Sequence, residues 1–129
     1  MRPRDSLVRL KAFQVNEKRR QRDQLANMIE EFVRMAGDLD AQIAAEEKRA
    51  GIDDPNHFAY PMPAKAARTR RENLAASHRE LMVQLDAANI ALEEAEAELE
   101  KAEAKERRDG RMAAEPAAAE PARASAMIG

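Results

Sequence analysis

Apolar residues recur at steps of three and four along two long stretches of the chain, the spacing of one face of an α-helix. The first stretch contributes Leu25, Met28, Phe32, Met35 and Leu39. It continues to Ile43, which falls one place off the strict register. We expect a first helix over about residues 5–50, capped by Asp5 or Ser6 and ended by Gly51 in a left-handed conformation.

A regular heptad pattern begins at residue 64 and alternates steps of four and three. Its members are Ala64, Ala67, Arg71, Leu74, His78, Leu81, Leu85, Ala88, Leu92, Ala95, Leu99 and Ala102. The pattern predicts a second helix over about residues 64–109, with Pro63 at its first position and Gly110 at its end. Between the helices lies GIDDPNHFAYPMP, residues 51–63, which holds three of the six prolines and predicts a turn.

Neither apolar stripe is wide enough to stabilise a helix alone, so the two helices must pair. The fold class predicted is all-α: a long antiparallel two-helix coiled-coil hairpin with residues 51–63 at its tip. The numbers of facing residues then sum to about 113.

Charge supports the antiparallel direction. Residues 1–24 carry eight Lys or Arg against three Asp or Glu, and residues 89–109 carry eight acidic against four basic residues. A parallel pair would place residues 1–24 beside residues 64–79, which hold five basic residues and one acidic residue and would repel them.

Two segments lack the pattern. NEKRRQRDQ, residues 16–24, has no apolar side chain although it should face Leu92, so the seam there is either loosened or covered by Lys and Arg stems. Residues 111–129 are aperiodic and rich in Ala, Pro and Glu. We therefore expect one hairpin domain over residues 1–110 and a disordered, flexible C-terminal tail over residues 111–129.

Composition limits the alternatives. The chain has 129 residues with 28 Ala but only 21 Leu, Ile, Val and Phe together, which rules out a thick globular core and leaves disorder as the competing interpretation. There is no cysteine, the net charge is −2, and no apolar run approaches the roughly 20 residues of a membrane span. We expect a soluble, cytoplasmic protein.

Candidate chemistry is sparse. The two histidines, His57 and His78, have no second His or Cys at ligand spacing, and no serine has a base beside it. We expect no enzyme, no metal, no cofactor and no small-molecule substrate. The basic clusters, residues 18–22 and 68–71, lack interleaved aromatics, so solvated faces or interhelical ion pairs are favoured over nucleic-acid binding.

Partner-binding candidates gather at and beside the tip. They are Phe58, Tyr60, Arg68, Arg71 and His78. Phe58 and Tyr60 are either anchors at an interface or covers that fold back over the seam near Ile43 and Ala67. Arg68, Arg70 and Arg71 would form a basic collar that steers an acidic partner. His78 is either a polar seam residue that fixes register or a partner contact.

Three segments resemble the short alphaproteobacterial form of the flagellar export protein FliJ family. They are MRPRDSLVRLKAFQVNEKRRQ, IEEFVRMAGDLDAQIAAEEKRAGIDDPNHFAYP and AKAARTRRENL, and the likeness covers roughly residues 1–109. Its most specific part is the tip GIDDPNHFAYP followed by AKAARxRRxNL.

The resemblance implies a two-helix coiled coil similar to that of the gamma subunit of rotary ATPases, acting in the bacterial flagellar type III export apparatus. The implied partners are the hexameric export ATPase, the cytoplasmic domain of the export gate and export chaperones. The implied place is the cytoplasm, peripheral to the inner membrane. The leading alternative is a generic coiled-coil adaptor or chaperone of another secretion or cytoskeletal system, and a more distant one is a nucleic-acid-associated helical protein that uses residues 18–22.

Overall fold

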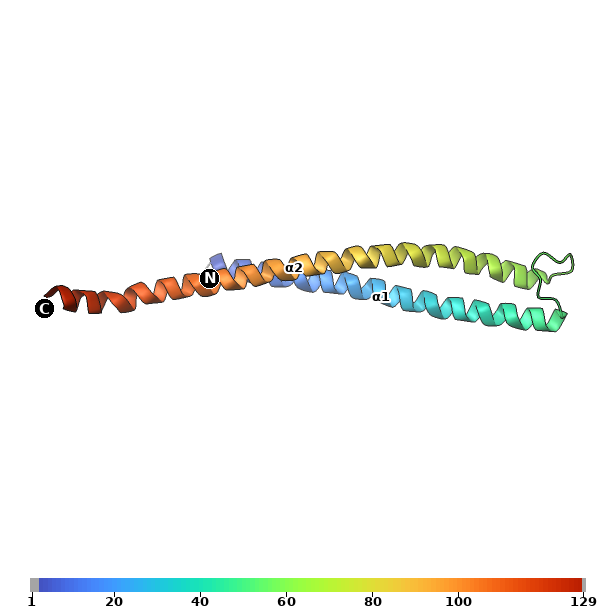
Figure 1. The fold of residues 1–129 in the computed structure, drawn as a ribbon, viewed down its shortest axis with the longest axis horizontal. Helices are drawn as coiled ribbons and strands as arrows, with labels where there is room; N and C mark the ends of the chain where they lie inside the picture. The colour runs from blue at the N-terminus through green and yellow to red at the C-terminus, as the bar shows by residue number, and fades with distance from the viewer. Residues whose placement is uncertain (1–2, 129) are drawn as a thin grey trace. The chain divides into compact units, whose positions relative to one another are not determined.

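The chain folds into two α-helices, and the computed structural model describes the backbone of residues 3–128 and the side chains of residues 6–111. Helix α1 spans Pro3–Ala50 and helix α2 spans Met62–Ile128. The helices pack against each other and are joined by the tip loop, here residues 51–61 (Figure 1). The predicted all-α, antiparallel two-helix hairpin is confirmed.

The chain divides into two compact units, each described separately: residues 21–89, which include the tip, and residues 1–20 with 90–129. In the tip unit, two ion pairs cross from α2 to α1. Arg68 Nη2 lies 2.9 Å from Glu47 Oε2, and Arg71 pairs with Asp40. The residue numbers of these pairs sum to 115 and 111, which bracket the predicted value of about 113.

The α2 side of the seam in the tip unit follows the heptad pattern. Ala64, Ala67 and Leu81 are buried, and Leu74, His78, Leu85 and Ala88 are half-buried. Arg71 is the exception, because it is exposed and pairs with Asp40 at the edge of the seam. A guanidinium group in the seam itself would have lost its water, so an edge position with a carboxylate partner is favoured.

The α1 side of the seam differs from the prediction at two positions. Leu25, Phe32 and Leu39 are half-buried, but Met28 and Met35 are 44% and 46% exposed. Ile29 and Ala36 take the expected places of these two methionines. Ile29, Ala36 and Ile43 are seven residues apart, so the apparent slip at Ile43 was the true register and the methionines lie on its flank.

The second unit contains the start of α1 and the later part of α2. Val15, Leu92 and Ala102 are buried there, and Leu99 is half-buried. Lys11 and Lys18 are also half-buried, and Lys11 Nζ lies 3.8 Å from Glu98 Oε2. Leu92 is buried, which agrees with the alternative of a covered seam at this position.

The helix ends follow from local chemistry. Gly51 has a φ of 72°, and the N–H groups of Gly51 and Ile52 both donate to the Glu47 carbonyl, at 2.8 and 3.3 Å. This left-handed cap ends α1, as predicted. At the start of α2, the Lys65 N–H donates to the Pro61 carbonyl at 3.0 Å.

Helix α2 does not end at Gly110, where the sequence predicts its end, but continues to Ile128. A glycine inside a helix costs only about 1 kcal/mol relative to alanine, so Gly110 alone is a weak stop signal. The side chains of residues 112–129 lie outside the described part of the chain, and the flexible tail stays a prediction.

Candidate functional site

The tip loop is held by its own hydrogen bonds. The side chain of Asp54 accepts from the Asn56 N–H at 3.0 Å, and its carbonyl accepts from the His57 N–H at 3.0 Å. His57 in turn accepts twice: its carbonyl from the Tyr60 N–H and its Nδ1 from the Ala59 N–H, both at 3.0 Å. These contacts bond the N–H groups of four of the five residues from Asn56 to Tyr60, so the loop supplies much of its own backbone hydrogen bonding.

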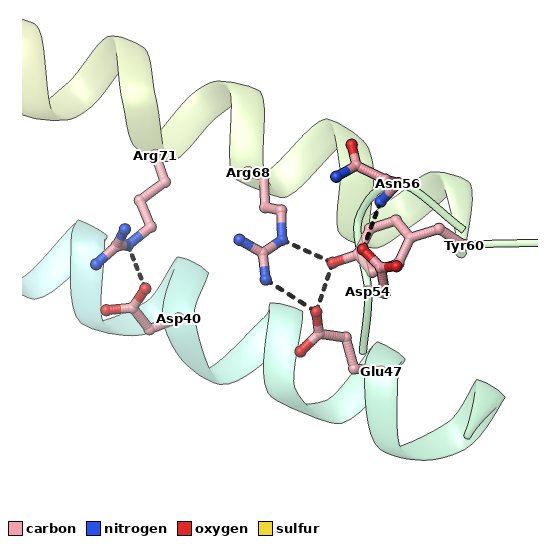
Figure 2. Close-up of polar contacts among 7 residues, drawn as sticks. All are labelled: Asp40, Glu47, Asp54, Asn56, Tyr60, Arg68 and Arg71. Atoms are coloured by element: carbon pink, nitrogen blue, oxygen red, sulfur yellow. Dashed lines mark hydrogen bonds and ion pairs between the residues drawn. The ribbon is translucent and has the colours of Figure 1, made fainter. Parts of the chain in front are cut away.

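Three side chains join the loop to both helices, and we call Glu47, Tyr60 and Arg68 the tip clamp (Figure 2). The Tyr60 hydroxyl donates to Glu47 Oε2 at 2.7 Å and accepts from Arg68 Nε at 2.7 Å. Arg68 Nη2 also donates to Glu47 Oε2 at 2.9 Å, which closes the triangle. The Arg68 guanidinium carbon lies 5.8 Å from the centre of the Tyr60 ring, within the range of a cation–π contact.

The clamp shifts the titration of all three groups. Hydrogen bonds from Tyr60 and then from Arg68 hold the pKa of Glu47 below its ordinary value. Burial, followed by the hydrogen bond to Glu47, raises the pKa of Tyr60. The bonds from Arg68 to Tyr60 and Glu47 raise the pKa of Arg68. Each shift favours the form that makes the contacts: a carboxylate, a neutral phenol and a guanidinium cation.

The two aromatic residues of the tip differ in burial, because only Tyr60 belongs to the clamp. Tyr60 is 7% exposed, and Ile43 and Ala67 are buried too, so Tyr60 takes the covering role. Phe58 is 97% exposed, and its ring stacks on that of His57 with a centroid distance of 4.7 Å. Of the two predicted aromatic anchors, only Phe58 is presented to solvent.

A groove lies between the helices two turns from the clamp, and we call it the His78 groove. It has a volume of about 450 Å³. Its lining residues are Phe32, Val33, Ala36, Gly37 and Asp40 from α1 and Arg71, Leu74, Ala75 and His78 from α2. The small side chains of Ala36, Gly37 and Ala75 leave this space open, while Phe32 and Leu74 make it apolar.

A second groove, the Arg70 groove, has a volume of about 390 Å³. It is lined by Met35, Asp38, Leu39, Arg70 and Leu74. Leu74 lines both grooves, and each groove has an Asp on α1 and an Arg on α2. Apolar floors with charged borders fit the side chains of a protein partner.

The five predicted partner-binding residues therefore have different surroundings. Tyr60 and Arg68 belong to the tip clamp. Arg71 pairs with Asp40, and it lines the His78 groove together with the half-buried His78. Phe58 lies on the loop, exposed to solvent and stacked on His57. The sequence analysis missed Glu47, because nothing in the sequence distinguishes it from the adjacent Glu46. It also missed the grooves, for which the interior glycine Gly37 was the available signal.

Among the side chains described, no group of three His, Cys, Asp or Glu could hold a metal ion. Within the part of the chain that the structure describes, neither helix has a stretch long and apolar enough to cross a membrane. No protein-family model, curated protein or solved structure matches the chain.

Proposed function

We propose that this chain is a non-enzymatic coiled-coil component of the bacterial flagellar type III export apparatus. In this role it couples the export ATPase to the cytoplasmic domain of the export gate and assists export chaperones. The protein works in the cytoplasm and is held near the inner membrane through these partners.

One observation carries the proposal. The tip and the segment AKAARTRRENL, the most specific part of the resemblance to the FliJ family, lie in the same compact unit, residues 21–89. Gly51 caps α1, Tyr60 and Arg68 complete the tip clamp, and Leu74 reaches the two grooves. The shared residues thus serve one purpose, which is to fix the tip and present a groove beside it.

The His78 groove is the contact we assign to the export gate. The groove is mostly apolar, and its volume of about 450 Å³ has room for one or two large side chains. The Asp40–Arg71 pair lies at its border. Such a site suits a short apolar segment of a partner, with the charged border adding specificity.

Binding to the two purified partners tests the proposal. The full chain should bind the export ATPase, the export-gate cytoplasmic domain, or both, and an unrelated two-helix coiled coil of similar charge should bind neither. Failure of the full chain to bind either partner would contradict the proposed function.

A matched pair of variants tests the groove. Val33 is 58% exposed and lines the His78 groove, whereas Val83 is 68% exposed and does not. Val33→Glu should weaken binding to the gate domain about tenfold or more, because it places a charge in an apolar site, while Val83→Glu should not. Equal binding by both variants would remove the groove from the interface.

A further inference from the structure

Phe58 is a large aromatic side chain that the fold leaves almost fully exposed, at 97%. Its only ring contact among the described residues is the stack on His57, which is on the same loop. Burying an aromatic side chain of this size gains about 2 kcal/mol or more, so a hairpin that buries Tyr60 two positions later has left that gain unused at Phe58.

Hydrogen bonds hold the loop on both sides of Phe58. His57 accepts the Ala59 N–H, and Tyr60 is fixed to α1 and α2 through Glu47 and Arg68. A side chain presented on an ordered loop loses little conformational entropy when it binds. This arrangement is characteristic of an interface anchor and not of a mobile loop residue.

Charge next to Phe58 indicates what would cover it. The loop contains Asp53 and Asp54 and no Lys or Arg. The basic residues nearest in sequence, Lys48, Arg49 and Lys65, belong to the flanking helices, as does Arg68, whose charge is paired with Glu47 in the clamp. Two tips placed together would bring their carboxylates close around the aromatic rings, which disfavours a second copy of the chain. The same carboxylates disfavour an anionic membrane surface.

We propose that Phe58 anchors the tip in an apolar pocket of a protein partner whose rim is basic. This contact is distinct from the His78 groove, so the hairpin has two separate binding elements: an aromatic anchor on the loop and a groove between the helices. The inference rests on the proposed function in taking its partner from the export ATPase and the export-gate domain.

The test measures the affinity of the full chain and its variants for each purified partner. Phe58→Ala should raise the Kd for one partner about 30-fold, the loss typical of an interface hot spot, while Val83→Ala should leave it unchanged. Asp53→Lys should slow association with that same partner, and the slowing should diminish at high salt because the charges are exposed. Circular dichroism of each variant should match that of the parent.

The outcomes separate this inference from the proposed function. If the parent binds a partner and Phe58→Ala binds it equally well, the anchor is wrong and the proposed function stands. If Asp53→Lys binds faster or more tightly, the rim of the partner is not basic and the proposed partner chemistry is wrong. If the parent binds neither partner, the proposed function and the anchor fail together.

Discussion

The Tyr60 hydroxyl lies 2.7 Å from Glu47 Oε2 although the two residues are 13 positions apart, and this bond fastens the tip loop to the last turn of α1. Tyr60→Phe removes the bond and keeps the ring. We expect faster hydrogen exchange of the loop amides and a lower midpoint of thermal unfolding, because Glu47 and Arg68 each lose a partner. Unchanged loop exchange would show that the hydroxyl does not hold the loop.

The clamp also makes stability depend on pH in two windows. The folded-state pKa of Glu47 lies below 4.5, so its contribution is present above that value and is lost as the pH falls through the folded-state pKa. The pKa of Tyr60 is raised above 10.0, so its contribution is present below pH 10 and is lost as the pH rises through the higher value. Glu47→Gln should flatten the acid limb of a plot of unfolding free energy against pH. An acid limb identical to the parent's would exclude Glu47 as its source.

The seam should dominate the stability of the hairpin. Leu81→Ala removes a buried side chain and should lower the free energy of unfolding by about 2–4 kcal/mol. Val83→Ala, an exposed neighbour, should change it by about 0.5 kcal/mol or less. Urea unfolding followed by circular dichroism measures both values, and equal losses would contradict the assigned seam.

The register of α1 can be tested at adjacent residues. Ile29 lies in the seam, whereas Met28 is 44% exposed on its flank. Ile29→Asp should therefore destabilise the hairpin by about 2 kcal/mol more than Met28→Asp, because only the first substitution places a charge among buried apolar groups. The opposite order would restore the register in which Met28 lies in the seam.

The pairing of Arg71 with Asp40 offers a second test of register. Both side chains are half-exposed, so reversing either charge should cost about 1 kcal/mol or less, and the double variant Asp40→Arg with Arg71→Asp should recover most of the loss. If the stability loss of the double variant equals the sum of the losses of the two single variants, Arg71 and Asp40 do not interact.

Gly37 lines the His78 groove, yet a methyl group added to it would meet no atom within 4 Å outside the adjoining backbone of its own helix. Gly37→Ala should therefore stabilise α1 by about 0.5–1 kcal/mol through helix propensity. The same change narrows the groove, so binding of the gate domain should weaken as stability rises. Unchanged binding would mean that the groove has no role in that contact.

The hairpin could be predicted from the sequence because its information is repetitive. The apolar residues Leu74, Leu81 and Leu85 repeat at heptad spacing, so each of them predicts the same seam. The opposite charges of the facing helix segments predict the same antiparallel pairing. In α1 the side chains of Met28 and Ile29 are both apolar and adjacent, so the pattern alone favoured the wrong one. Distinguishing them required the seven-residue step to Ile43.

The candidate site was less predictable because it depends on single contacts. Nothing in the pattern distinguishes buried Tyr60 from exposed Phe58, since both are aromatic residues on the same loop. The difference arises from the distances that join Tyr60 to Glu47 and Arg68, which only the folded tip brings together. Periodicity describes faces of helices, and it carries no information about a loop that has no period.

Leu74 is the wall that the two grooves have in common. Because the same side chain lines both grooves, a ligand that displaces it in one groove changes the space available in the other. Two partners could then compete or cooperate without ever touching. By thermodynamic linkage, the factor by which the first partner changes the affinity for the second equals the factor by which the second changes the affinity for the first.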